Sequence, residues 1–193
     1  KGVEIGHGAL GNFLAAIGQL LALKPGHRLL AITTLGFDIS ILELFLPLLA
    51  GASVRVADEN LALDGFALKQ QLEQAAITHL QATPTTWRML LTAGWRAPKG
   101  FSALCGGEAL PADLAADLVQ AGARLWNLYG PTEATVWTSA YQVNESAEQL
   151  KAQGGAPICL GAPLANTQLY VLDDKLQPLP LGVYGDLWIG GGG

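Results

Sequence analysis

Residues 123–133 read ARLWNLYGPTE, and in this stretch a strand-like segment runs directly into a loop with a Gly-Pro turn. An alternating segment from Val136 to Val143 follows, so the loop lies at the end of a strand. Ligands of α/β proteins collect at the carboxyl ends of strands. The loop carries an aromatic ring, a hydroxyl and a carboxylate, which suit a stacked base, a phosphate and Mg²⁺. The alternative is a simple turn in which Thr132 caps a short helix.

Helical and strand-like patterns alternate upstream of this loop, from residue 8 to about residue 126. Apolar residues recur there at helical spacing, and short apolar runs bounded by turn residues are typical of buried parallel strands. The expected helices span residues 10–21, 39–49, 66–76, 84–91 and 112–120, and the expected strands span residues 28–33, 53–57, 77–82, 102–105 and 123–128. Repeated strand–helix units predict an α/β fold, with a mostly parallel sheet flanked by helices on both faces.

The pattern changes after Pro131, where helical periodicity is lost. Strand-like segments at residues 138–143, 168–172 and 187–189 are separated by turns, and Asp173-Asp174-Lys175 is a hairpin-like turn signal. Residues 142–153 are polar and are expected to form a surface loop. We therefore expect an α/β lobe over residues 1–130 and an incomplete, truncated β-rich segment over residues 131–193.

Composition limits the classes of function. Of the 193 residues, 50% are hydrophobic and 14% are charged, which is enough for a core and argues against disorder. The formal net charge is −5 with only 11 Lys and Arg, so we expect no nucleic-acid partner. The apolar run at residues 39–50 contains Pro47 and is too short for a membrane span, and no secretory leader is seen. We therefore expect no membrane partner and a cytoplasmic location.

The two cysteines and three histidines have neither disulfide nor metal-ligand spacing. We expect His7, His27 and His79 to lie at the surface or to cap helices.

The segment NLYGPTE at residues 127–133 resembles the adenine-binding signature of the amino-acid adenylation domains of nonribosomal peptide synthetases, within the superfamily of acyl-adenylate-forming enzymes. Similar segments occur in that family's order along nearly all of the chain. They are GFDIS at 36–40, CGGEA at 105–109, LGAPLAN at 160–166, YVLD at 170–173, LQPLPLG at 176–182 and GDLWIGG at 185–191. The chain departs from the family at Ala162, where an arginine is expected, and at Asp186, where a glutamate is expected. The resemblance implies the central part of the large N-terminal subdomain.

The resemblance implies a nucleotide site for ATP and Mg²⁺ in this region. Thr132 and Glu133 would be catalytic, because Thr132 would donate to a phosphate oxygen and Glu133 would hold Mg²⁺ beside the phosphates. Tyr129 would stack near the adenine and ribose. The residues expected to bind the nucleotide are Gly107, Glu108, Ala109, Asn127, Tyr129, Gly130 and Thr132. The pair Gly106-Gly107 also reads as an ordinary turn from a strand to a helix.

The resemblance also implies an amino-acid pocket. Its expected lining is Asp38, Ile39, Leu42, Gln81, Leu104, Gly106, Leu128, Val136 and Trp137. Asp38 would pair with the substrate ammonium group. Trp137, Leu104 and Leu128 would fill the space of a substrate side chain, a pattern that resembles the one associated with glycine. The alternatives are that Asp38 or Ser40 caps the next helix and that the two leucines belong to the sheet core.

The expected activity is that of an ATP-dependent ligase, in which the carboxylate of an amino acid attacks ATP to give an aminoacyl-adenylate. The resemblance implies a peptidyl carrier domain and a condensation domain as partners, a small accessory protein as an optional one, and a role in antibiotic biosynthesis. Lys1-Gly2-Val3 resembles the end of the family's phosphate loop. That loop, a ribose-binding aspartate and a lysine-bearing C-terminal domain are not found in the 193 residues, so we expect the fragment alone to be inactive.

Two other classes of protein stay open. An acyl- or aryl-CoA ligase of the same superfamily would form a similar adenylate, but a substrate without an amine would leave Asp38 without a partner. A nucleotide-binding or structural α/β domain without adenylation activity is the other class. Residues 6–11 read GHGALG and fit a dinucleotide motif, but they precede the first strand and lie in a helical pattern. For Glu43, one turn after Asp38, we favour a structural role.

Overall fold

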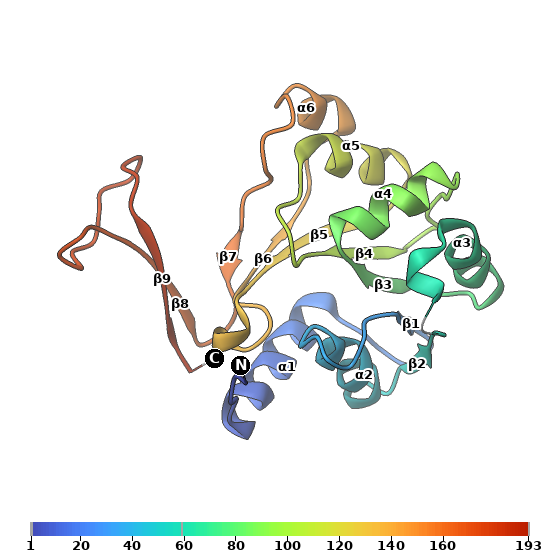
Figure 1. Ribbon diagram of the computed structural model, residues 1–193, viewed down its shortest axis with the longest axis horizontal. Coiled ribbons are helices and arrows are strands. Elements are labelled where there is room, and N and C mark those ends of the chain that lie inside the picture. Colours follow the sequence, from blue (N-terminus) through green and yellow to red (C-terminus); the bar gives the residue numbers. More distant parts are fainter. Residues whose placement is uncertain (1, 59, 193) are drawn as a thin grey trace.

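The computed structural model describes residues 2–58 and 60–192, and helices and strands alternate along the first part of the chain (Figure 1). The strands are β1 (Arg28–Ala31), β2 (Ser53–Val56), β3 (His79–Ala82), β4 (Ser102–Cys105), β5 (Arg124–Tyr129), β6 (Ser139–Gln142), β7 (Ala162–Pro163), β8 (Thr167–Leu172) and β9 (Asp186–Gly191). The helices are α1 (His7–Leu21), α2 (Ser40–Leu49), α3 (Gly65–Gln74), α4 (Pro84–Thr92), α5 (Ala112–Gln120) and α6 (Ala147–Lys151), with 3₁₀ turns η1 (Leu61–Leu63) and η2 (Thr132–Ala134).

Within the described residues, seven strands form one sheet in the order β2-β1-β3-β4-β5-β6-β7. The strands β2, β1, β3, β4 and β5 pair in parallel, whereas β6 and β7 are antiparallel to their neighbours. Because β1 lies between β2 and β3, the chain leaves it first toward one edge of the sheet and later returns on its other side. The carboxyl ends of β1 and β3 therefore form a topological switch point, where α/β sheets open a crevice.

Helices cover both faces of the sheet, which confirms the predicted fold class (Figure 1). On one face α1 and α2 pack against Leu29 and Leu104, and on the other face α3, α4 and α5 pack against Leu30 and Cys105. Neighbouring residues of one strand point to opposite faces. Because neighbours such as Leu29 and Leu30 are both apolar, both faces of these strands are apolar. The continuous apolar runs in the sequence follow from this double burial.

The sheet continues past residue 130, where the sequence predicts the end of the α/β lobe. Tyr129 of β5 pairs with Ser139 of β6, and β7 pairs with β6. That predicted boundary therefore falls inside the sheet. The chain passes from β5 to β6 without a crossover helix, because antiparallel neighbours need none.

The strands β8 and β9 form a separate antiparallel pair that projects from the sheet (Figure 1). The predicted turn at 173–175 is present, since Asp173 Oδ1 accepts hydrogen bonds from Lys175 N at 2.9 Å and Gln177 N at 2.8 Å. The connection to β9 is longer than a hairpin turn and runs through residues 173–185.

The prediction of a surface loop over residues 142–153 is wrong in part, because α6 lies within it. Ser146 Oγ accepts from Gln149 N at 3.3 Å, and Gln149 Oε1 accepts from Ser146 N at 2.8 Å. This reciprocal pair is a capping box, and its signal in the sequence is a serine followed three residues later by a glutamine. Ala147 and Leu150 are buried and anchor the helix.

The prediction that His79 lies at the surface is also wrong. It lies in β3, which is buried along its whole length. Its Nδ1 lies 2.8 Å from Thr78 Oγ1, and its ring centroid lies 4.9 Å from that of His27. Burial, followed by the charges of His27 and Arg124, lowers the pKa of His79 to about 4. The imidazole is therefore neutral near pH 7.

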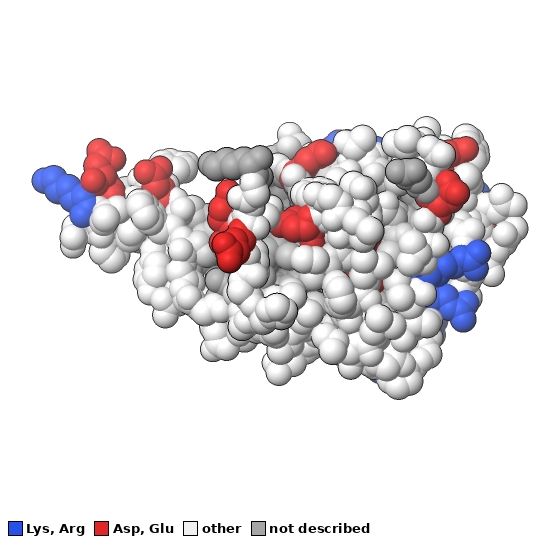
Figure 2. Space-filling view, turned by 60° about the horizontal axis from the view of Figure 1, so that its bottom comes forward, with Lys and Arg blue, Asp and Glu red and all other residues white. Residues whose placement is uncertain are grey.

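Charged side chains are sparse on the face shown in Figure 2, where acidic groups are spread from end to end and the few basic groups lie mainly at the two ends. This distribution agrees with the net charge of −5. None of the described helices is long and apolar enough to cross a membrane.

Candidate functional site

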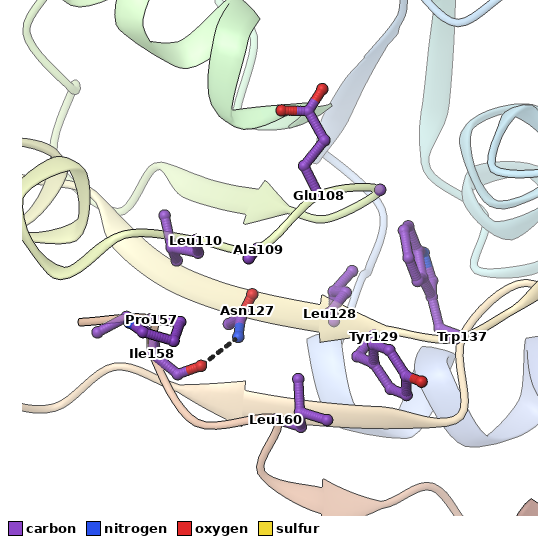
Figure 3. Close-up of a pocket in the computed structure, with 12 residues that line it drawn as sticks. Glu108, Ala109, Leu110, Asn127, Leu128, Tyr129, Trp137, Pro157, Ile158 and Leu160 are labelled. Carbon is purple, nitrogen blue, oxygen red and sulfur yellow. Dashed lines mark hydrogen bonds between the residues drawn. The ribbon is translucent and has the colours of Figure 1, made fainter. Parts of the chain in front are cut away.

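A cavity of about 260 Å³ opens at the carboxyl ends of β4 and β5 (Figure 3). It is lined by Gly107, Glu108, Ala109, Leu110, Asn127, Leu128, Tyr129, Gly130, Trp137, Pro157, Ile158 and Leu160. Small-molecule pockets have volumes of roughly 300–1,000 Å³, so this cavity suits one planar ring system better than a whole nucleotide.

The cavity brings together most of the residues predicted to bind the nucleotide. Of that set, only Thr132 does not line it, and Leu128 and Trp137 join it from the predicted amino-acid pocket. The sequence did not predict Leu110 or the wall formed by Pro157, Ile158 and Leu160. The only signal for that wall was the family-like segment that begins at Leu160.

Asn127 shows how this wall is tied to the sheet. It lies at the end of β5, and its Nδ2 donates to Cys159 O at 2.9 Å and to Ile158 O at 3.4 Å. Its oxygen points toward Ala109 across the cavity (Figure 3). The NH₂ group of the amide is therefore bound to the protein, and its oxygen can accept a hydrogen bond from a ligand.

The loop between β5 and β6 is closed at its base. Thr138 N and Oγ1 both donate to Tyr129 O, at 2.7 and 3.1 Å. Gly130 lies so close to the returning chain that a Cβ there would stand 2.6 Å from Val136 O. Thr135 and Val136 have φ angles of 64° and 65°, which β-branched residues rarely adopt. Such strain persists only where the surroundings hold it, so this loop has a defined shape.

Thr132 and Glu133 lie in the 3₁₀ turn η2 at the tip of this loop, outside the lining of the cavity. The alternative interpretation is right in one part, since Thr132 starts a short helical turn, and wrong in the other, because Pro131 occupies the cap position and no side-chain cap bond forms. Glu133 is exposed and makes no ion pair within the described residues. Its carboxylate is a hard oxygen donor of the kind that Mg²⁺ takes.

The residues of the predicted amino-acid pocket form a tightly packed group behind the cavity. Those in the apolar cluster beneath α1 and α2 are Ile39, Leu42, Leu104, Leu128, Val136 and Trp137. Leu104 is fully buried, as the core interpretation expects, and Leu128 belongs both to this core and to the lining of the cavity. A Cβ on Gly106 would lie 2.5 Å from Trp137 Cη2, so the indole covers this glycine.

Asp38 is half-buried at the start of α2. The alternative that Asp38 or Ser40 caps this helix is wrong, because Ile39 holds the cap position and no side-chain cap bond forms. Asp38 also makes no ion pair within the described part of the chain. Its carboxylate is therefore available to a cationic group of a ligand.

Glu43 takes part in a group of hydrogen bonds for which the sequence carries no signal. Its oxygens accept from Ile32 N at 2.9 Å, Thr33 N at 3.0 Å, Thr33 Oγ1 at 2.6 Å and Gln81 Nε2 at 2.9 Å. Burial raises the pKa of Glu43, and the hydrogen bonds from Thr33, Gln81 and Ile32 oppose that rise. Gln81 in turn accepts from Trp137 Nε1 at 3.0 Å.

No group of three or more metal-binding side chains occurs among residues 2–58 and 60–192. Glu133 would hold a metal ion at this loop through its one carboxylate, and the ion would supply positive charge beside a bound anion.

Comparison with known proteins places this geometry in a family. The sequence matches the family described as AMP-binding enzyme over residues 1–193. A dimodular nonribosomal peptide synthase from Bacillus subtilis (strain 168) is 44% identical over 193 residues, which are 100% of this chain and 8% of that protein. The PKS-NRPS hybrid synthetase acdB from Aspergillus candidus is 40% identical over 194 residues, covering 100% of this chain and 7% of that protein.

Solved structures with a similar fold also come from nonribosomal peptide synthetases. A holo four-domain nonribosomal peptide synthetase bound to AMP and glycine has a TM-score of 0.92 and 49% identity, over 100% of this chain and 14% of that one. The N-terminal subdomain of NpsA from Klebsiella oxytoca, in complex with 3-hydroxyanthranilyl-AMSN, has a TM-score of 0.85 and 28% identity, over 99% of this chain and 48% of that one. The chain thus spans a small part of its curated relatives. It belongs to the AMP-binding enzyme family and corresponds to part of the N-terminal subdomain of the adenylation domains of nonribosomal peptide synthetases.

Proposed function

We propose that the complete protein activates glycine with ATP as glycyl-adenylate and transfers the glycyl group to a carrier domain as a thioester. Adenylation forms a bond between a carboxylate oxygen of glycine and the α-phosphorus of ATP, and it releases pyrophosphate. The step needs alignment and charge neutralisation rather than proton transfer. The residues of this chain would accordingly bind and orient the two substrates.

The observation that carries the choice of glycine is the contact between Trp137 and Gly106. A methyl group on Gly106 would meet Trp137 Cη2 at 2.5 Å and Leu128 O at 2.8 Å, so protein atoms fill the space beside this glycine. A pocket filled from its own walls rejects larger substrates through overlap. The solved relative bound to AMP and glycine supports the same choice.

Asp38 would receive the ammonium group of glycine, because its carboxylate has neither a cap bond nor an ion pair within the described residues. An ammonium group next to this half-buried carboxylate gains a charge-assisted hydrogen bond. A ligase for simple fatty or aryl acids would supply no such partner, which favours an amino acid over an acid without an amine.

The adenine would occupy the cavity at the ends of β4 and β5. Asn127 would offer its oxygen to the exocyclic amine of the base, and the backbone of residues 107–109 would lie along the ring. Gly107 has a φ of 83°, a conformation that favours glycine, and its missing side chain leaves room for a planar ligand. Tyr129 would cover the ring from the end of β5.

Glu133 would hold Mg²⁺, and Thr132 would donate to a phosphate oxygen at the tip of the same loop. Bound Mg²⁺ would neutralise the charge of the phosphates during displacement. The proposed partners are the peptidyl carrier and condensation domains of a larger synthetase, with a small accessory protein as an optional one, in the cytoplasm and in the synthesis of an antibiotic peptide.

The test is the exchange of labelled pyrophosphate into ATP by the complete protein, with each amino acid offered separately. Glycine should give the fastest exchange and alanine the next fastest. Strong exchange with a large apolar or aromatic amino acid and none with glycine would refute the choice of substrate. Exchange with acids that have no amine would favour the acyl- or aryl-CoA ligase instead.

A further inference from the structure

A buried carboxylate lies at the switch point of the sheet. Glu43 extends from α2 to the backbone just after β1, and its side chain is fully buried. Its Oε2 accepts from the N–H groups of Ile32 and Thr33, and its Oε1 accepts from Thr33 Oγ1 and from Gln81 of β3. Each carboxyl oxygen thus faces a donor that cannot act as an acceptor, so both oxygens must accept. No cation takes part in this group of hydrogen bonds.

Glu43 and the carbonyl of Ile39 together hold the NH₂ group of Gln81. Gln81 Nε2 donates to Glu43 Oε1 and to Ile39 O, both at 2.9 Å. With its NH₂ group committed on that side, the amide must turn its oxygen the other way. That oxygen accepts from Trp137 Nε1 at 3.0 Å, and an indole N–H can only donate. The carboxylate, the Ile39 carbonyl and the indole N–H therefore all favour the same orientation of the Gln81 amide.

The end of the same indole that lies opposite Nε1 covers Gly106. Trp137 Cη2 would lie 2.5 Å from a Cβ on Gly106, while Nε1 at the other side of the ring is bound to Gln81. One hydrogen bond therefore restrains the rotation of the ring, and the rotation decides how much space stands beside Gly106. Both side chains are almost fully buried, so no water can readily replace this bond.

We propose that Glu43 is a positioning residue for amino-acid selection, which acts through Gln81 to hold the Trp137 indole against Gly106. This inference deepens the proposed function and rests on it, since it names a residue behind the pocket that keeps the pocket small. Glu43 touches no substrate. Its contribution is to exclude side chains larger than hydrogen, not to bind glycine.

The sharpest test is Glu43→Gln in the complete protein. The N–H groups of Ile32 and Thr33 still need an acceptor, so the new amide places its oxygen there and turns its NH₂ toward Gln81. Two NH₂ groups would then face each other. Gln81 can relieve this contact by turning its amide, which would also break its bond to Ile39 O, or by moving away from residue 43, and either change disrupts the bond to Trp137 Nε1. The bond that restrains the ring is lost, although the volume of the side chain is unchanged.

The measured quantity is the ratio of kcat/KM for glycine over alanine in pyrophosphate exchange. We expect it to fall roughly tenfold in Glu43→Gln, because one methyl group in a close-fitting pocket changes selection by about that factor or more. Thr33→Val is the matched control. It removes one hydrogen bond from the same carboxylate but leaves the Gln81 amide as it is, so the ratio should stay within about twofold of the wild type.

Equal losses for glycine and alanine in Glu43→Gln, with a lower melting temperature and an unchanged ratio, would show that Glu43 is only structural and would overturn the proposal.

The crystal structure of the Glu43→Gln protein separates this proposal from the proposed function. We expect Trp137 Nε1 to leave hydrogen-bond distance of residue 81 and the ring to move off Gly106. A ring that stays in place overturns the positioning role whatever the substrate is. A wild-type protein that does not prefer glycine refutes the proposed function instead, and the displaced ring would then still support the positioning role.

Discussion

Replacing Gly130 by alanine should disrupt the loop that carries the predicted Mg²⁺ ligand. A Cβ at this position would lie 2.6 Å from Val136 O, 2.7 Å from Thr138 N and 2.7 Å from Trp137 Cα. All three are backbone atoms, so no change of rotamer can relieve the overlap. The returning chain must move away, and the 2.7 Å hydrogen bond from Thr138 N to Tyr129 O must lengthen with it.

The expected cost is about 2–4 kcal/mol of stability, from overpacking of about 1–3 kcal/mol and a weakened hydrogen bond of about 1 kcal/mol. The measurement is the melting temperature of the complete protein together with pyrophosphate exchange, and both should fall. Gly11→Ala is the control, since Gly11 lies exposed in α1 with nothing within 4 Å of its missing Cβ. That variant should stabilise the helix by up to about 1 kcal/mol.

A Gly130→Ala protein that melts and exchanges like the wild type would refute the reasoning. It would mean that the loop shifts without loss, and that the close approach of residues 130 and 136 does not define the site.

Three further predictions concern other parts of the chain in the complete protein. Asp38→Ala should cost about 2–5 kcal/mol of glycine binding, measured as a change in Kd. ATP affinity and melting temperature should stay unchanged, and a joint fall of both would make Asp38 structural. Trp137→Ser should lower the kcat/KM ratio of glycine over alanine and valine by roughly tenfold or more, and an unchanged ratio in a folded variant would assign Trp137 to the core alone. Acidification from about pH 7 to about pH 4.5 should destabilise the fold by up to about 2.5 kcal/mol through His79, whose folded-state pKa is about 4 against an ordinary 6.5. The unfolded chain binds the proton at a higher pH than the folded protein does, so this stability is lost as pH falls. His79→Gln should therefore flatten the plot of stability against pH, and parallel plots for the variant and the wild type would contradict the assignment.

The order of helices and strands could be predicted from the sequence because double burial leaves a simple pattern. Strands such as β4 are apolar on both faces, and the helices between them keep an apolar side toward the sheet. The end of the sheet could not be predicted, because β5 and β6 are antiparallel neighbours joined by a loop, without the crossover helix that marks each earlier strand. The helix α6 depended on a local cap at Ser146, a signal that reaches only three residues.

The residues of the site also include some that the sequence could predict and others that it could not. Residues within one motif, such as those from Asn127 to Gly130, could be assigned together because a short loop keeps them together. The wall at Pro157 and Ile158 could not, since it reaches the cavity only through tertiary contacts, including Ile158 N with Leu110 O at 2.8 Å. The bond between Gln81 and Trp137 joins positions 56 residues apart, and no spacing rule connects them.

The polar groups of the site fall into two sets that substitutions should separate. Glu43, Gln81 and Asn127 already have protein partners, and breaking such a buried bond costs about 1–3 kcal/mol, so a ligand does not readily recruit their committed atoms. The carboxylates of Asp38 and Glu133 have neither a cap bond nor an ion pair within the described residues. A substitution in the first set leaves a neighbouring polar group without its hydrogen bond, so its effect passes on to further residues. We expect a change in the second set to remove the proposed ligand contact and to leave the protein intact. Glu43→Gln should therefore alter selection without touching the substrate, whereas Asp38→Ala should weaken binding without altering the fold.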